Sequence, residues 1–135
     1  KLKNYLKVKY HASVLEIYYY DAYPEVGTRE YSVSNKHSFY TALQKRMGYI
    51  VRKKPLKQIK TGSGLIIEKG NMDVELTIDA VALVNSYDVA VLFSQDQDFA
   101  EVAKEIRTIA HEQDRWIQIA SAFPLSSVSR NREMV

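Results

Sequence analysis

The chain has 135 residues, which suits one domain with a buried core, and its 46% hydrophobic and 26% charged residues are ordinary values for a folded protein. It has no cysteine, which excludes a disulfide scaffold, a thiolate metal site and a thiol nucleophile, and no apolar run is long enough to span a membrane. The net charge of +3 divides unevenly, since residues 1–60 carry 13 Lys and Arg against 4 Asp and Glu, while residues 61–135 carry 6 against 12. This division fits a polyanion-binding face beside a cation-binding site, and it also fits a solvated surface with unevenly spread charge.

Helices and strands are expected to alternate along the chain. Hydrophobic spacing, β-branched runs and turn residues predict the elements of the first half: a helix to about residue 12, a strand over 14–20, a loop over 21–33, a helix from Ser34 to Gly48 and a strand over 49–52. A turn over 61–64 and a strand over 65–68 are expected next. The same signals then predict a helix over 72–84, a strand over 88–93, a helix over 98–112 and a strand over 115–120. The alternation predicts an α/β fold with a mainly parallel sheet. The tyrosines 18–20 are expected to alternate between core and surface rather than to form a binding platform.

The first candidate site follows the apolar strand 88–93. Asp96 and Asp98 come directly after it, and functional groups gather beyond the carboxyl ends of parallel strands. Two carboxylates this close repel each other unless a hard divalent cation such as Mg²⁺ binds them. The alternative is helix capping, because Asp98 with Glu101 fits a capping box, as does Ser94 with Gln97.

The second candidate is the helix over 72–84. At about 100° per residue, Glu75 and Asp79 form its polar stripe, and apolar residues occupy most of the remaining girth, so the helix is expected to be buried around most of its girth. Asp73 falls outside that stripe, near Ala80, so it is either a first-turn residue favoured by the helix dipole or a residue aimed into a site. Asp79 is interpreted as a solvated residue unless the fold turns the stripe toward Asp96.

The third candidate is a basic stretch near Tyr49. It consists of Arg52, Lys53, Lys54, Lys57 and Lys60. Basic residues beside an aromatic ring bind a phosphate backbone and stack a base. The alternative is an ordinary charged strand edge, where lysines block pairing between sheets.

Taken in order, five segments resemble the NYN domain, the PIN-like nuclease family of the LabA/DUF88 type. The segments are Tyr18-Tyr-Tyr-Asp21, Gly48-Tyr-Ile-Val51, Lys54-Pro-Leu-Lys57, Lys69-Gly-Asn-Met-Asp73 with Asp79, and Val91-Leu-Phe-Ser-Gln-Asp-Gln-Asp-Phe99. The resemblance runs from about Val14 to Ala120. It implies a Rossmann-like three-layer fold with a mainly parallel sheet, whose strand ends carry an acidic cluster that binds Mg²⁺ or Mn²⁺ and cleaves RNA.

On matching positions, the resemblance assigns the catalytic and metal-binding roles to Asp73, Asp96 and Asp98, with Asp79 as a fourth metal ligand. The nucleic-acid-binding residues are then Arg52, Lys53, Lys54, Lys57 and Lys69. The resemblance further implies one domain over residues 1–135 that lacks the family's first strand, with a polar tail over about 121–135. RNA is the expected partner and the cytoplasm the expected location, no membrane association is expected, and a homo-oligomer is left open.

The leading hypothesis is therefore a metal-dependent ribonuclease. A non-catalytic RNA-binding or adaptor module with an incomplete site is the alternative. A hydrolase of small phosphoesters that uses the same ions is a third.

Overall fold

The computed structural model describes residues 1–23, 30–69, 72–94 and 97–122. The chain forms two compact units, Lys1–Glu75 and Leu76–Val135. The described residues confirm the predicted fold class, since each unit combines helices with a pair of parallel strands. Within these residues, no helix combines the length and the apolar character needed to cross a membrane. The expectation of one domain over residues 1–135 stays a prediction.

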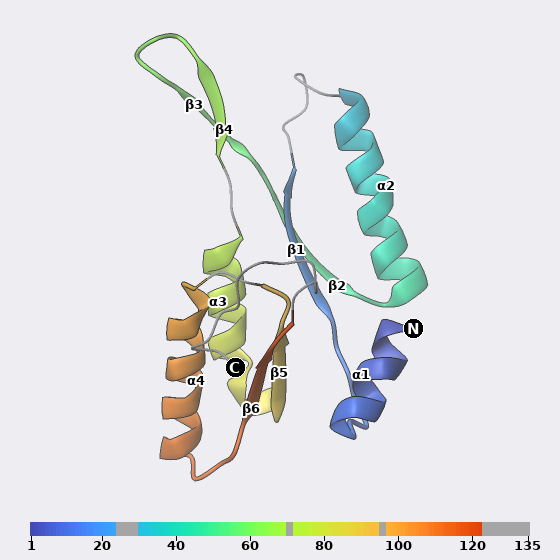
Figure 1. Ribbon diagram of the computed structural model, residues 1–135. Helices are drawn as coiled ribbons and strands as arrows, with labels where there is room; N and C mark the ends of the chain where they lie inside the picture. The colour runs from blue at the N-terminus through green and yellow to red at the C-terminus, as the bar shows by residue number, and fades with distance from the viewer. Residues whose placement is uncertain (24–29, 70–71, 95–96, 123–135) are drawn as a thin grey trace. The chain divides into compact units, whose positions relative to one another are not determined.

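In the first unit, a helix joins two parallel strands (Figure 1). The elements are α1 (Leu2–Tyr10), β1 (Tyr18–Tyr23), α2 (Glu30–Met47), β2 (Ile50–Pro55), β3 (Lys57–Lys60) and β4 (Ile66–Lys69). β1 pairs with β2 from Tyr18 opposite Ile50 to Tyr23 opposite Pro55. A parallel pair needs a crossover connection, and α2 lies in that connection. Gly48 follows α2 with φ of +67°, a left-handed conformation that favours glycine.

Aromatic rings attach α2 to one face of the β1–β2 pair. Successive strand residues point to opposite faces, and Tyr19 and Tyr23 point to the α2 side. The Tyr19 ring lies 5.8 Å from the Phe39 ring, and the Tyr23 ring lies 4.8 Å from the His37 ring. Tyr40 is fully buried, with its ring 6.5 Å from that of Tyr19 and 6.4 Å from that of Tyr23. The tyrosines therefore alternate between the two faces, as predicted, but all three are half-buried rather than divided between core and surface.

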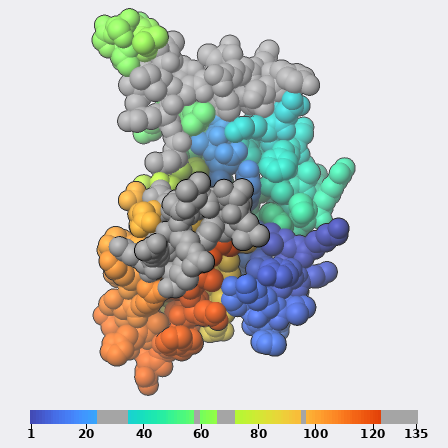
Figure 2. All heavy atoms as spheres, viewed as in Figure 1, coloured from blue at the N-terminus to red at the C-terminus, as the bar shows by residue number. Residues whose placement is uncertain are grey.

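β3 and β4 form an antiparallel hairpin in which Lys57 lies opposite Lys69. Its turn falls at residues 61–64, as predicted. The Thr61 amide donates to the Leu65 carbonyl oxygen at 2.9 Å, and Gly64 has φ of +83°. Figure 2 shows this turn in bright green at the tip of the hairpin, where Leu65 is 66% exposed.

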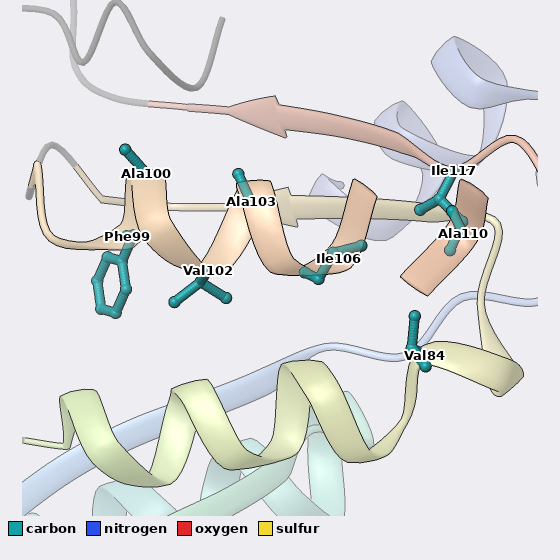
Figure 3. Close-up of a cluster of buried hydrophobic side chains, with 8 residues drawn as sticks. All are labelled: Val84, Phe99, Ala100, Val102, Ala103, Ile106, Ala110 and Ile117. Atoms are coloured by element: carbon teal, nitrogen blue, oxygen red, sulfur yellow. The ribbon is translucent and has the colours of Figure 1, made fainter. Parts of the chain in front are cut away.

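The second unit has a parallel strand pair with α4 in its crossover. Its elements are α3 (Asp73–Ala82), whose first three residues belong to the first unit, a 3-10 helix (Val84–Ser86), β5 (Val89–Leu92), α4 (Phe99–Glu112) and β6 (Gln118–Ser121). β5 pairs with β6 from Val89 opposite Gln118 to Leu92 opposite Ser121. The apolar side of α4 supplies most of the core. The buried cluster consists of Val84, Phe99, Ala100, Val102, Ala103, Ile106, Ala110 and Ile117 (Figure 3).

Hydrogen bonds from Arg115 stabilise the connection between α4 and β6. Its guanidinium donates to the carbonyl oxygens of Val84 at 3.2 Å and Tyr87 at 2.8 Å, and it lies 3.5 Å from the Asp88 carboxylate. These carbonyl groups lie just before β5, and Arg115 lies just before β6. The charged side chain therefore links the starts of these two strands. Charge-assisted hydrogen bonds of this kind are stronger than neutral ones.

Several predicted boundaries shift. The strand expected over 14–20 begins at Tyr18 and runs to Tyr23, because pairing with β2 rather than the β-branched run sets its ends. α2 begins at Glu30, so Ser34 lies inside the helix and does not cap it. Ser121, placed in the polar tail by the sequence, closes β6. Residues 123–135 of that tail lie outside the described residues.

The prediction that the helix over 72–84 is buried around most of its girth is wrong. Val74 is 62% exposed and Ile78 is 59% exposed. Leu76 and Ala80 pack against the core cluster and are only partly buried. One side of α3 therefore carries the packing, and a second, apolar side faces outward.

Candidate functional site

Two of the four predicted metal-binding aspartates lie on α3. Asp73 is the first residue of the helix and is half-buried, so its carboxylate lies at the positive end of the helix dipole. Asp79 lies in the second half of the helix and is also half-buried. The helix dipole favours a negative charge at the first of these positions but not at the second.

The packing of α3 shows which side Asp73 occupies. At about 100° per residue, Asp73 lies within about 60° of Leu76 and about 20° of Ala80. Leu76 and Ala80 are the α3 residues that pack against the core formed by α4. Figure 3 shows α3 running beside α4 in the same direction. By helical position, Asp73 therefore lies on the same side of α3 as Leu76 and Ala80, whereas Glu75 and Asp79 form a separate stripe.

Asp98 stands at the N-cap position of α4 and is exposed. Its backbone is helical, with φ of −62° and ψ of −28°, and its side chain makes no capping hydrogen bond. The capping-box alternative is therefore wrong for Asp98. Asp96 lies outside the described residues. Ser94, just before it, accepts a hydrogen bond at its carbonyl oxygen from the Ser121 hydroxyl at 3.0 Å, which joins the ends of β5 and β6.

Among the described residues, no three His, Asp or Glu side chains lie close enough to hold a metal ion. The predicted set includes Asp96, outside those residues, so convergence of Asp73, Asp79, Asp96 and Asp98 stays a prediction. Their chemistry suits Mg²⁺ or Mn²⁺, because carboxylate oxygens are the ligands of hard divalent cations.

A salt bridge joins β2 to the first turn of α3. The Lys54 ammonium lies 2.7 Å from Oε1 of Glu75, and the hydrogen bond from Lys54 lowers the pKa of Glu75. Oε2 of Glu75 is buried and accepts no hydrogen bond from the described part of the chain. Lys54, predicted to bind nucleic acid, is therefore engaged in holding α3. Glu75 keeps one oxygen with unused acceptor capacity.

The other basic residues divide between the two faces of β2. The Lys53 ammonium lies 3.4 Å from Nδ1 of His37 and 5.1 Å from the Tyr40 ring centroid, on the α2 side. Arg52 lies on the opposite face, with its Cζ 5.8 Å from the Tyr18 ring centroid. Both Arg52 and Lys53 are exposed, as is Lys57 at the start of β3. Adjacent residues in the sequence thus point to different surfaces.

Lys69 ends β4 directly opposite Lys57 in the hairpin register. The two predicted phosphate-binding lysines of the hairpin therefore share one rung of the ladder.

Sequence reasoning missed a polar network around Asp21, near the carboxyl end of β1. The Asp21 carboxylate accepts a hydrogen bond from the Tyr40 hydroxyl at 2.7 Å and pairs with the Lys36 ammonium at 3.3 Å. Lys36 also donates to the Ala22 carbonyl oxygen at 3.2 Å. Burial and the hydrogen bond to Asp21 raise the pKa of Tyr40. The i,i+4 spacing of Lys36 and Tyr40 was a signal, because it places both on one face of a helix.

Comparison with known proteins identifies two similarities. The NYN domain matches residues 2–122. The chain is 32% identical over 102 residues to a protein of Synechococcus elongatus described as "Low amplitude and bright protein LabA". That alignment covers 74% of this chain and 53% of the relative, so the chain spans about half the length of the relative. No solved structure matches the chain.

The Asp21 network leads to a prediction about stability. Tyr40→Phe removes only the hydroxyl that donates to Asp21, and we expect the free energy of unfolding at pH 7 to fall by about 1–2 kcal/mol, since Lys36 remains as a partner. Because the folded state holds the phenol proton above the usual pKa of 10.0, the stability that Tyr40 contributes is complete below that pH and is lost as the pH rises above it. The difference between wild type and variant should therefore narrow above about pH 10.

Urea unfolding on both sides of that pH measures the difference. Tyr5→Phe is the control, because Tyr5 is 60% exposed on α1 and its substitution should change stability by less than about 0.5 kcal/mol at pH 7. A Tyr40→Phe protein as stable as wild type at pH 7 would show that the hydrogen bond contributes nothing.

Proposed function

Because this chain belongs to the NYN domain family, which is generally a family of nucleases and RNA-binding proteins, we propose that it is a metal-dependent ribonuclease that hydrolyses phosphodiester bonds in RNA. The family match over residues 2–122 carries this proposal. It spans both acidic segments and the basic strand. The family is usually dependent on divalent metal ions, and the choice of Mg²⁺ or Mn²⁺ is part of the proposal.

In this proposal, Asp73, Asp96 and Asp98 hold the ion, with Asp79 as a fourth ligand. A bound divalent ion supplies a coordinated water of lowered pKa and stabilises negative charge on the phosphate. Two features of the described residues support the assignment. Asp98 is exposed at the N-cap position of α4, and Asp73 lies at the first position of α3, outside the stripe formed by Glu75 and Asp79.

The basic residues bind and orient the RNA. Arg52, Lys53 and Lys57 are exposed, and their charge raises the local concentration of a polyanion. Lys54 acts indirectly, since its bond to Glu75 fixes the helix that carries Asp73. Lys69, four residues before Asp73, neutralises a phosphate of the RNA that lies nearer the metal-binding aspartates. A cytoplasmic location belongs to the same proposal, because RNA substrates are found there.

The first test is Asp96→Asn. The substitution keeps the size of the side chain and removes the charge that a hard cation needs, so metal-dependent cleavage should fall by about a hundredfold or more while the fold is kept. Cleavage of a labelled single-stranded RNA by the full-length protein, with Mg²⁺ or Mn²⁺ and then with EDTA, measures this. Asp88→Asn is the matched control, because Asp88 precedes β5 at the opposite end of the strand and its side chain is 91% exposed.

Wild-type activity in Asp96→Asn would refute the proposed site. RNA binding without cleavage, in wild-type protein supplied with metal, would favour the non-catalytic binding module. Cleavage of mononucleotides but not of RNA would favour a small-phosphoester hydrolase.

The second test concerns thermal stability. Carboxylates held together repel, and an ion that binds only the folded state stabilises it by about 2.7 kcal/mol at one hundred times its dissociation constant. Millimolar Mn²⁺ should therefore raise the melting temperature of the wild type, and Asp73→Ala or Asp98→Ala should reduce that rise. Differential scanning calorimetry gives the shift, and Asp88→Ala should keep it. An equal shift in wild type and Asp73→Ala would make Asp73 a helix-start residue and not a ligand.

The third test separates phosphate contacts from long-range charge. Replacing Lys53 and Lys57 with Ala should reduce the slope of log Kd against log salt for single-stranded RNA by about 1.4, since each contact contributes about 0.7. The control replaces Lys7 and Lys45, two exposed lysines on α1 and α2, which removes the same charge. Fluorescence anisotropy at several salt concentrations measures the slope. Equal slopes in both double variants would assign Lys53 and Lys57 to protection of the strand edges.

A further inference from the structure

The face of β1–β2 opposite α2 carries two tyrosines and an arginine. Tyr19, Asp21 and Tyr23 contact α2 residues, so strand alternation puts Tyr18 and Tyr20 on the other face. The register pairs Tyr20 with Arg52, and paired residues in a sheet share a face. The sequence alone argues against a platform, because consecutive tyrosines of a strand point to opposite faces. Pairing with β2 adds a cation beside them.

The geometry of these side chains suits flat ligands. The Tyr18 and Tyr20 rings are nearly parallel, at 18°, with their centroids 6.5 Å apart. Cζ of Arg52 lies 5.8 Å from the Tyr18 ring centroid, within cation–π range. The Tyr18 hydroxyl donates to Glu16 at 3.2 Å, which helps to fix that ring. Both rings are half-buried, whereas Arg52 is exposed.

We propose that Tyr18, Tyr20 and Arg52 form a stacking platform that binds the bases of single-stranded RNA. The inference rests on the proposed function and specifies how the substrate is held. Aromatic rings beside a basic groove bind single strands without sequence preference, because every base has a π face. Charge favours a nucleic acid over a protein partner, since residues 1–60 carry 13 Lys and Arg against 4 Asp and Glu.

The platform leads toward the start of α3. The next residue of β2 on the same face is Lys54, which holds Glu75 at 2.7 Å. Glu75 is in the first turn of α3, two residues after Asp73. Two residues of a strand advance about 6.6 Å, so one register step separates Arg52 from the lysine that anchors this turn. Bases held on Tyr18 and Tyr20 would direct the strand toward the helix that begins with Asp73.

The test compares oligonucleotides with and without bases. In EDTA, where cleavage cannot occur, we expect a short single-stranded RNA to bind about tenfold or more tightly than an abasic oligomer of equal length. Tyr18→Leu and Tyr20→Leu should each weaken binding of the RNA about tenfold, equivalent to about 1.4 kcal/mol. Both should leave binding of the abasic oligomer and the salt slope unchanged, because stacking releases no counterions.

Tyr5→Leu is the matched control. Tyr5 is 60% exposed on α1 and also has a cation near its ring, Lys9 at 5.8 Å, but it lies on no part of the platform. Its substitution should leave RNA affinity unchanged. Arg52→Lys keeps the charge and loses the planar stacking surface, so it should weaken binding of RNA more than binding of the abasic oligomer.

A measurement on unaltered protein covers the case in which the leucine variants fail to fold. Ultraviolet crosslinking of bound RNA, followed by mass spectrometry, should place adducts on Tyr18 or Tyr20. Equal affinity for RNA and the abasic oligomer, or adducts confined to other residues, would overturn the platform. The nuclease proposal is tested separately, since cleavage lost in Asp96→Asn bears on the metal site whatever the anisotropy shows. Failure of the wild type to bind any RNA would overturn both.

Discussion

Parallel pairing of β1 with β2 is the constraint on which the first unit depends. It requires the crossover through α2, and it fixes which side chains that helix can meet. Because the side-chain period of a strand is two, a register slip of one residue would move Tyr19 and Asp21 away from Tyr40 and expose them. The rings around Tyr40 and the hydrogen bond to Asp21 therefore specify the register together. An apolar contact alone would tolerate more displacement than a 2.7 Å hydrogen bond does.

Different sides of helix α3 make different contacts. Leu76 and Ala80 contribute to the core beside α4, while Glu75 is bound to Lys54 of β2. Burying one Glu75 oxygen without a hydrogen bond costs free energy. The charge-assisted bond from Lys54 to the other oxygen, which lowers the pKa of Glu75, offsets part of that cost. Asp73 begins the same turn, so its position depends on the bond between Lys54 and Glu75.

Element types were predictable from the sequence, whereas faces and partners were not. Periodicity identified the four strands that form the two parallel pairs and the helices between them, and Gly48 marked the end of α2. The limits of β1 depend on β2, a partner that local propensity does not contain. Tertiary packing also decided the exposure of Val74 and Ile78, since an apolar helix residue is buried only where something covers it.

The candidate site was predictable to a similar degree. The motifs located Asp73 and Asp98 at helix starts, where the structure has them. The role of Lys54 was not visible, because Glu75 lies 21 residues away and no local pattern links the two. Asp21 was missed for the same reason, since its partners Lys36 and Tyr40 lie on a different element. Contacts between distant segments are the part that one sequence does not reveal.

The pleat of β2 also determines which face of the strand each basic residue lies on. Arg52 and Lys53 are neighbours in the chain, yet β2 sends them to opposite faces. Lys53 meets His37 and the Tyr40 ring, so its ammonium charge lies on the side that α2 covers. Arg52 lies on the face whose next residue in β2, Lys54, anchors the first turn of α3. A planar guanidinium stacks on a ring and keeps its charge, whereas an ammonium acts as a point charge. The order Arg then Lys therefore puts the cation suited to stacking on the face that leads to Asp73, and the reverse order would exchange the two.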